Sequence, residues 1–245
     1  MNDIPVVIVS RDRLTCLKQL INSLLERDCG KNVYILDSDS QYTPLLNYYD
    51  EIEKKYKINI IKFKENIGPF YFLDNLSLFG HIHKCNNFFY TDCDCVPIDE
   101  TPKSFLDDIN EMMMLYNLYN LGMFLKIDDV RPILYKNLKK QKTLQECEQS
   151  SCRTDSIIAN DLKYNCKIYT AITDTTFKCI NYRKCKMFKK GRHYVTFKLA
   201  NGRVGYPYEV RHLPWYYDLN NLPEDEKFYI SRADRKISSF YSNVL

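Results

Sequence analysis

Two carboxylates one residue apart follow an apolar run in the first half of the chain. The run, residues 88–91, leads directly into Asp92 and Asp94. If this run is a buried strand, both acids lie at the carboxyl edge of a sheet, where open α/β folds bind their ligands. Two hard oxygen ligands suit Mn²⁺ or Mg²⁺, ions that usually share their coordination shell with substrate phosphates. The spacing therefore predicts a site for a metal-bound phosphate compound.

Polar residues also follow the other apolar runs of the first half. Ser10 ends the first run, Asp37 follows the second, and Asn66 follows the third. A nucleotide laid across this edge is expected to bond its base to Asp37 and its ribose to Asp92, while a metal on Asp94 holds its phosphates. The alternative is that these residues only cap strand-to-helix turns, which Asp, Ser and Asn favour.

The elements that must position these residues follow from the pattern of apolar residues. The first half alternates between β-branched runs and segments in which leucine and isoleucine recur at helical spacing, which is typical of a parallel sheet with helical crossovers. Strands are predicted at 4–9, 32–36, 58–63 and 87–91, and helices at 14–25, 44–56 and about 69–78. The polar residues that end the strands then lie together at one sheet edge.

After residue 97 the regular alternation is lost. The patterns predict a helix at 102–116, a strand at 121–127, helical material up to 149, two short strands within 166–180 and a helix beginning near 223. A basic segment, 186–205, contains three glycines and is predicted to be a loop or hairpin. The cations of this segment that are candidates for closing over bound phosphates are Arg192, His193 and Arg203.

Composition narrows the class of protein. The chain has 245 residues, 45% of them hydrophobic, which is enough for one large core. Its formal net charge of +4 gives no reason to expect a nucleic-acid partner. The sequence predicts no signal peptide and no transmembrane segment, and its ten cysteines include no CxxC pair for structural zinc. We therefore expect a soluble, cytoplasmic protein with free thiols.

Several of these motifs together resemble a known group of enzymes. The segments that carry the resemblance are 4–13, 35–40, 42–46, 66–69, 91–97, 174–177 and 212–218. In this order they are similar to the GT-A fold of nucleotide-sugar-dependent glycosyltransferases, close to glycosyltransferase family two. The resemblance implies a Rossmann-like, mostly parallel central sheet flanked by helices, with a smaller irregular acceptor-side region. It also implies one domain, 1–245, with a nucleotide-binding half, 1–100, and an acceptor-binding half, 101–245.

The resemblance also implies roles for individual residues. Asp92 would contact ribose or metal, and Asp94 would bind the Mn²⁺ or Mg²⁺ that clamps the donor diphosphate. Asp37 would bind the base. His212, which lies close to Trp215 in the sequence, would complete the metal shell, since neutral imidazole is a good Mn²⁺ ligand. The alternative for His212 is a packed, hydrogen-bonded histidine in an aromatic cluster.

An inverting sugar transfer also needs a carboxylate that accepts the proton of the acceptor hydroxyl. The resemblance indicates Asp174, although threonines flank it where related enzymes often have a Glu-Asp pair. Asp128, Asp129 and Glu209 are rival carboxylates, and Asp174 would in the alternative bind an acceptor hydroxyl or cap a strand. The predicted reaction moves a sugar from a nucleotide donor, taken to be UDP-linked, to a hydroxyl of a glycan, lipid-linked or protein acceptor.

Three other functions stay open on the sequence alone. A sugar nucleotidyltransferase shares the sheet and the metal, but it would have a Gly-rich basic loop after the first strand, which the segment 10–15 is not. A catalytically silent module would bind a nucleotide sugar or glycan without turnover. A nucleic-acid binder would lose affinity steeply with salt and would use Lys184, Lys186, Lys189, Lys190 and Arg192. The sequence favours the glycosyltransferase and predicts neither the sugar nor the oligomeric state.

Overall fold

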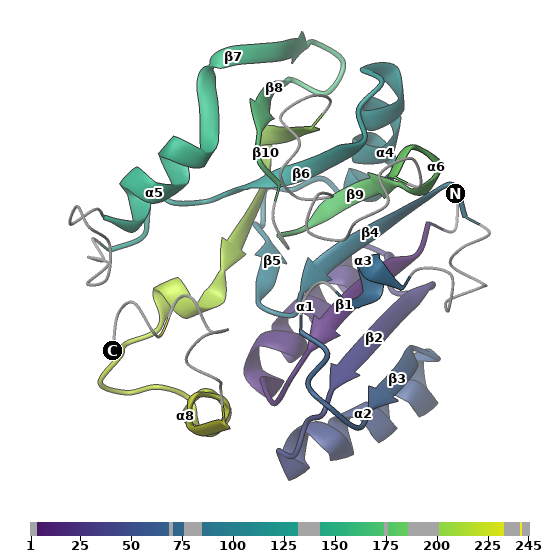
Figure 1. Cartoon of the computed structure of the whole chain (residues 1–245), viewed down its shortest axis with the longest axis vertical. Helices are drawn as coiled ribbons and strands as arrows, with labels where there is room; N and C mark the ends of the chain where they lie inside the picture. Colours follow the sequence, from purple (N-terminus) through teal and green to yellow (C-terminus); the bar gives the residue numbers. More distant parts are fainter. Residues whose placement is uncertain are drawn as a thin grey trace.

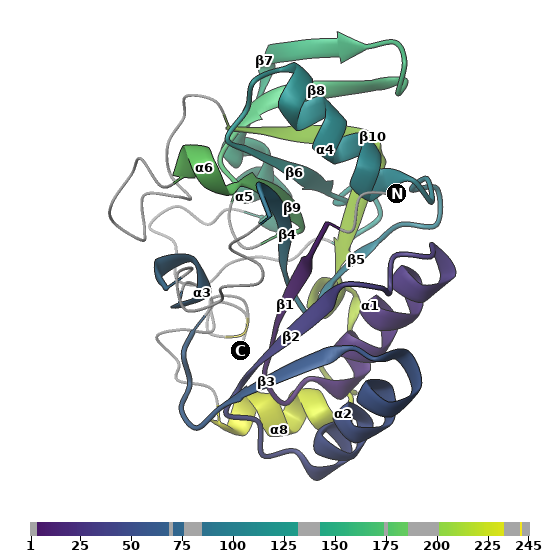
Figure 2. The ribbon, with the colours of Figure 1, turned by 90° about the vertical axis from the view of Figure 1, so that its right-hand side faces the viewer.

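The computed structural model describes residues 4–68, 71–75, 85–131, 143–173, 176–185, 201–232 and 241. Ten strands formed by these residues make one continuous sheet (Figure 1). Nine of them follow the order β3-β2-β1-β4-β9-β6-β10-β8-β7, and β5 pairs with β10 beside this path. Helices lie on both faces of the sheet (Figure 2), so the predicted α/β architecture is confirmed.

The first four strands along this path are parallel, as the alternation of the sequence predicted. They are β1 (Val6–Ser10), β2 (Val33–Ser38), β3 (Asn59–Phe63) and β4 (Asn87–Asp92). Val6, Val7 and Ile8 are all buried, because β1 lies between two strands and under helices on both faces. Since the four strands run in one direction, their carboxyl ends lie at the same edge of the sheet.

Helices α1 and α2 cover one face of this parallel half, and α3 lies on the other (Figure 2). Their bounds are Leu14–Glu26 for α1, Thr43–Tyr56 for α2 and Tyr71–Asp74 for α3. The buried positions of α1, among them Leu17, Leu20, Ile21 and Leu24, recur every three to four residues. The larger hydrophobic core lies beneath α1 and α2, while Phe72 of α3 belongs to a smaller core on the opposite face.

The second half extends the sheet mostly with antiparallel pairs. Its strands are β5 (Cys95–Pro97), β6 (Asn120–Leu125), β7 (Cys152–Asp161), β8 (Cys166–Ala171), β9 (Lys178–Asn181) and β10 (Asn201–His212). Strand β9 inserts antiparallel between β4 and β6. The long strand β10 runs parallel to β6 and antiparallel to both β8 and β5, and so links the outer hairpin to the strand that follows Asp94.

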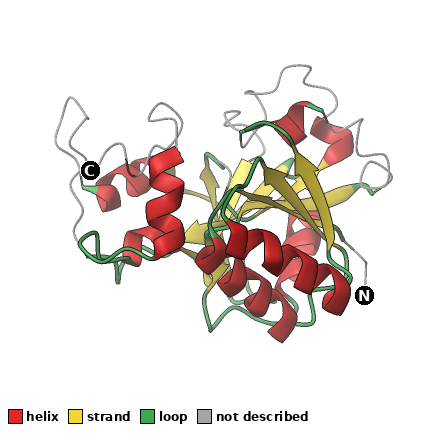
Figure 3. Cartoon of the chain, turned by 90° about the horizontal axis from the view of Figure 1, so that it is seen from below, coloured by secondary structure: helices red, strands yellow, loops and turns green. Residues whose placement is uncertain are grey.

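The remaining helices are α4 (Phe105–Leu115), α5 (Leu144–Ser151), α6 (Tyr182–Cys185), the 3₁₀ turn η3 (Leu213–Tyr216) and α8 (Glu224–Arg232). Seen from below, helices and strands form separate layers (Figure 3). Within the described residues, no helix combines the length and the apolar character needed to cross a membrane.

The structure also differs from the sequence-based predictions. The sequence-based predictions missed β5 and β7, and they assigned 201–205 to a loop or hairpin, whereas these residues begin the long strand β10. Close packing explains the glycine at position 202, because a Cβ there would lie 3.1 Å from the carbonyl oxygen of Tyr169 on β8. The rest of the predicted loop, 186–200, and parts of two predicted helices lie outside the described residues.

Candidate active site

The carboxyl ends of β1, β2 and β4 meet at one edge of the sheet (Figure 1). Ser10, the last residue of β1, pairs with Asp37 on β2, and Val9 pairs with Asp92 on β4. Ser10 and Asp37 are buried, whereas Asp92 is half-buried. Three residues predicted to contact a nucleotide are therefore brought together on neighbouring strands.

Asp37 is anchored by neighbouring groups at this edge. Its Oδ1 accepts a hydrogen bond from the Tyr49 hydroxyl at 2.8 Å, and its Oδ2 accepts one from the backbone N–H of Ser40 at 3.2 Å. Burial raises the pKa of Asp37 above its ordinary value, and the hydrogen bonds from Ser40 and Tyr49 oppose this rise. The carboxylate thus joins α2 to β2. Its contact with a nucleobase stays a prediction.

Tyr49→Phe is expected to lower the free energy of unfolding by about 1–3 kcal/mol, because it removes a donor from a buried acceptor. Losing a bond to the charged carboxylate raises the pKa of Asp37 further. In the unfolded chain this carboxyl loses its proton near the ordinary aspartate pKa of about 3.9, whereas the folded variant keeps the proton to higher pH. Raising the pH therefore favours the unfolded state of the variant. The stability deficit should therefore grow as pH rises from 4 to 7, which urea denaturation at several pH values measures; a deficit independent of pH would contradict this role.

Asn66 lies beyond β3 and is exposed. Its Oδ1 accepts hydrogen bonds from the Ser38 hydroxyl at 2.9 Å and from the backbone N–H of Gly68 at 3.1 Å. Gly68 has a φ of +64°, a conformation that glycine adopts readily. Asn66 therefore joins the ends of β2 and β3 and caps a turn, and a contact with a nucleotide is not tested by this geometry.

The pairing of β5 with β10 brings Asp94 and His212 together. His212 lies opposite Cys95, and the backbone N–H of Leu213 donates to the carbonyl oxygen of Asp94 at 2.9 Å. This register leaves His212 Nε2 at 3.3 Å from Asp94 Oδ2. The ring centroid of Trp215 lies 4.6 Å from that of His212, so the histidine is held between an aromatic ring and the carboxylate.

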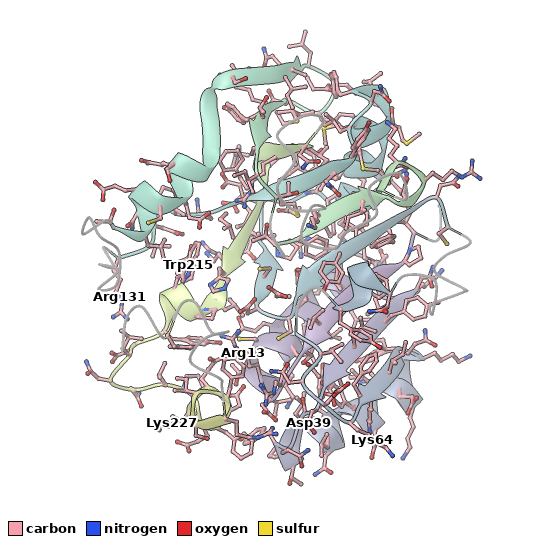
Figure 4. All side chains as sticks on the ribbon, viewed as in Figure 1. Arg13, Asp39, Lys64, Arg131, Trp215 and Lys227 are labelled. Carbon is pink, nitrogen blue, oxygen red and sulfur yellow. The ribbon has the colours of Figure 1, made fainter. Side chains whose placement is uncertain are left out.

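Arg13 is a third member of this cluster, and the sequence analysis did not assign it a role. Its Nη1 donates to Asp94 Oδ2, the same oxygen that faces His212. Asp94 is only 3% exposed. Figure 4 shows Arg13 between the ends of the parallel strands, near Asp39, and helix α8, which carries Lys227.

The electrostatics of the cluster follow from these contacts. Burial alone would raise the pKa of Asp94, but the positive charges of His212 and Arg13 lower it far below its usual range. Burial alone would lower the pKa of His212, but the Asp94 carboxylate raises it above its ordinary value. Asp94 is therefore fully ionised at neutral pH.

Helix α8 supplies the counter-ion of Arg13. Glu226 Oε1 accepts from Arg13 Nε at 2.8 Å, and Glu226 Oε2 accepts from Arg13 Nη2 at 3.1 Å. The Tyr241 hydroxyl donates to Glu226 Oε2 at 2.6 Å. In the sequence, the acids at the start of this helix indicate only a favourable interaction with the helix dipole, and no local pattern points to this ion pair.

Two further contacts fasten α8 to the loops that follow β1 and β2. Asp225 accepts from the backbone N–H of Thr15 at 2.6 Å and from its hydroxyl at 2.8 Å, which caps the first turn of α1. At the other end of α8, Arg232 donates to Asp12 Oδ2 at 2.6 Å and to Asp39 Oδ2 at 3.1 Å. The helix is thus part of the strand-end region rather than a peripheral tail.

The donor atoms of Asp94 and His212 fit a divalent metal. Two adjacent ligands of an octahedral ion with bonds of about 2.1 Å are separated by about 3.0 Å, and Asp94 Oδ2 and His212 Nε2 are 3.3 Å apart. A carboxylate oxygen has two lone pairs, so the Arg13 bond leaves one for a metal. Within the described part of the chain, no three His, Cys, Asp or Glu residues gather as a metal cage.

The predicted general base, Asp174, lies outside the described residues, as do Arg192 and His193. Arg203, which was predicted to lie on the same phosphate-closing loop, is instead buried on β10, where its Nε donates to the carbonyl oxygen of Ile172 at 3.1 Å. Strand pairing therefore removes Arg203 from the group of mobile cations that the sequence suggested.

The three rival carboxylates all lie near cations. Asp128 is 2.9 Å from Lys126 Nζ, and Asp129 is 2.9 Å from Arg211. Glu209 lies 3.9 Å from Lys126 Nζ, and burial raises its pKa above the ordinary value. Burial thus favours the protonated form of Glu209 more than water would, while Asp128 and Asp129 form surface ion pairs.

The described residues also line a hollow of about 240 Å³ on the outer hairpin. Asn165 and Tyr169 of the β7–β8 region and Tyr206 of β10 contribute to its wall. None of the residues predicted to bind metal or nucleotide lies in it, so the ends of the parallel strands remain the candidate site.

Comparisons with known proteins identify the fold. The sequence matches no protein-family model and no curated protein sequence. Among solved structures, the chain is similar to the mannosyltransferase PcManGT from Pyrobaculum calidifontis, solved with GDP-Man and Mn²⁺. The TM-score is 0.54 at 10% identity, over 94% of this chain and 60% of that one.

Two further solved structures have similar folds. TarS residues 1–349 from S. aureus give a TM-score of 0.51 at 14% identity, over 85% of this chain and 59% of that one. GalNAc-T7 with UDP, GalNAc and Mn²⁺ gives 0.50 at 14% identity, over 85% of this chain and 43% of that one. The chain thus spans less than two thirds of the length of each of these structures.

The fold is therefore that of the GT-A glycosyltransferases, as the sequence motifs predicted. The more specific similarity to glycosyltransferase family two stays a prediction.

Proposed function

We propose that the protein is a metal-dependent glycosyltransferase that moves a sugar from a nucleotide-sugar donor to a hydroxyl acceptor with inversion. One observation carries the proposal: at the carboxyl edge of a GT-A sheet, His212 Nε2 lies 3.3 Å from Asp94 Oδ2. A carboxylate and an imidazole at this distance form a partial ligand set that needs phosphate oxygens to be complete. Ligands of open α/β sheets bind at this edge.

The donor is proposed to lie across the ends of the parallel strands. Asp37 accepts a hydrogen bond from the base, Asp92 contacts the ribose or the metal, and Ser10 and Asn66 line the nucleotide. Asp94 and His212 hold Mn²⁺ or Mg²⁺. The metal, when bound, supplies Lewis-acid neutralisation of the charge that develops on the departing diphosphate. We take the donor to be UDP-linked.

Asp174 is proposed to act as the general base of the transfer. Its carboxylate takes the proton of the acceptor hydroxyl while the hydroxyl oxygen forms a bond to the anomeric carbon. The bond between that carbon and the diphosphate oxygen breaks on the opposite face, and the electron pair leaves with the nucleoside diphosphate. The products are an inverted glycoside and the nucleoside diphosphate, with the proton on Asp174.

Titration calorimetry with UDP, GDP and their sugar conjugates, each with Mn²⁺ and with chelator, tests the proposal. We expect one nucleotide series to bind with a Kd that weakens at least about tenfold in chelator, because the metal links the diphosphate to Asp94. Release of nucleoside diphosphate in the presence of a hydroxyl acceptor measures turnover. Release of pyrophosphate from a sugar phosphate and a nucleoside triphosphate would contradict the proposal and identify a nucleotidyltransferase, and metal-independent binding without turnover would identify a silent module.

A further inference from the structure

Glu226 is a fully buried carboxylate whose oxygens are all used. Its two oxygens accept from two different nitrogens of Arg13, at 2.8 and 3.1 Å, and one of them also accepts from Tyr241 at 2.6 Å. The thiol of Cys16 lies 3.2 Å from Glu226 Oε1. Such a two-pronged pairing of a guanidinium with a carboxylate is geometrically specific as well as strong.

The third nitrogen of the Arg13 guanidinium, Nη1, points toward the candidate metal site. Glu226 binds Nε and Nη2, which leaves Nη1 to donate to Asp94 Oδ2. The guanidinium is planar and rigid, so fixing two of its nitrogens fixes the direction of the third. The Tyr229 ring, on the same helix as Glu226, lies 4.7 Å from the guanidinium carbon and restricts its tilt.

Arg13 is a single positive charge between two carboxylates, Glu226 and Asp94. Arg13 is always positive, because a guanidinium does not lose its proton in a protein. Because Glu226 balances that charge, the negative charge of Asp94 remains available to a cation. If Glu226 were neutral, Asp94 alone would balance Arg13, and a divalent ion would meet a site without net negative charge.

We propose that Glu226 is a positioning residue of the donor site: through Arg13 it orients the Asp94 carboxylate and preserves the negative charge with which Asp94 binds a divalent metal. The inference rests on the proposed function for the metal. It gives Glu226 of helix α8, more than two hundred residues after β1, an effect on the donor site through Arg13.

The first test is Mn²⁺ alone, titrated into metal-free full-length protein by calorimetry and by the electron paramagnetic resonance of free Mn²⁺. Glu226→Gln keeps the size of the side chain and removes its charge, and we expect Mn²⁺ to bind about 10–100-fold more weakly, as for other residues that orient metal ligands. The matched control is Glu224→Gln, which makes the same change at a carboxylate of α8 that is 78% exposed and pairs with Lys227, and it should leave the Mn²⁺ Kd unchanged.

A second measurement needs no metal. In chelator, urea unfolding of Asp94→Asn, Glu226→Gln and the double variant forms a double-mutant cycle. Either carboxylate alone can still balance Arg13, so we expect the double substitution to cost more than the sum of the single ones. The cycle of Asp94→Asn with Glu224→Gln should be additive, because Glu224 is exposed and pairs with Lys227. If Glu226→Gln does not fold, Glu226→Asp keeps the charge and withdraws the two-pronged contact, and weaker Mn²⁺ binding is expected from it as well.

The outcomes separate the two proposals. If the wild-type protein binds Mn²⁺ and Glu226→Gln binds it equally well, the role of Glu226 is overturned and the proposed function stands. If the wild-type protein binds no Mn²⁺, either alone or with UDP or GDP present, the metal-dependent function fails, and an additive cycle would then refute the coupling of Glu226 to Asp94 independently.

Discussion

Asp94→Asn is expected to remove most of the Mn²⁺-dependent affinity for the nucleotide donor. Asparagine has nearly the same size and can still accept from Arg13, so the fold should survive. In the proposed site, however, the metal would lose the carboxylate ligand that lies 3.3 Å from His212 Nε2. Removing one partner of a buried charge pair costs about 2–5 kcal/mol, which corresponds to about a 30- to 5,000-fold weaker Kd. Calorimetry with the donor that binds wild type, at saturating Mn²⁺, measures the loss.

The matched control for this substitution is Asp128→Asn. Asp128 is another carboxylate after a strand of the same sheet, but its side chain is 75% exposed and pairs with Lys126 at the surface. We expect the Asp128→Asn variant to bind the donor with a Kd within about twofold of that of the wild type, because exposed ion pairs contribute little. If both variants bound the donor as wild type does, the metal would lie elsewhere; equal losses in both would indicate a general effect of net charge.

The parallel half of the fold could be predicted because its local and tertiary signals agree. The part of β1 from Val6 to Val9 is apolar at every position, since the strand is covered on both faces, and the helical spacing in α1 matches the face that the structure buries. The polar residues that end these strands then lie together by topology alone. For this reason Ser10, Asp37 and Asp92 were correctly expected at one edge.

The second half was harder to predict because antiparallel pairing depends on partners that are distant in the sequence. Strand β10 begins with glycines that read as a loop, and only the neighbouring strand β8 reveals that Gly202 is needed for close packing. The three-residue strand β5 has no period long enough to detect, yet its pairing with β10 brings His212 to Asp94. The resemblance to a family indicated His212; the residue pattern alone did not.

The contact between Arg13 and Glu226 could not be predicted from the sequence. The two residues are 213 positions apart, and each has an ordinary local explanation: Arg13 precedes a helix, and Glu226 lies in the acidic first turn of another. Burial of charges that must be paired is a tertiary property. The sequence signal was only a helix beginning near residue 223 with acids in its first turn.

The energetics of this contact lead to the second large effect. The Arg13 side chain is about 10% exposed and lies between two carboxylates that are more buried still. Taking such charges out of water is costly, and it is compensated only while every partner is present. Arg13 thus has a structural role in addition to its effect on the candidate metal site.

Arg13→Met is accordingly expected to lower the free energy of unfolding by about 3–5 kcal/mol, since it leaves Glu226 buried without its counter-ion and removes the cation beside Asp94. Arg211→Met is the matched control, because Arg211 pairs with Asp129 at a similar distance of 2.9 Å but both side chains are more than a third exposed; its cost should be about 0–1 kcal/mol. Adding Glu226→Gln to Arg13→Met should recover part of the loss, because it removes the unpaired charge. Urea denaturation in chelator measures all three, and equal costs for the two arginine variants would show that the buried pair contributes no more than a surface one.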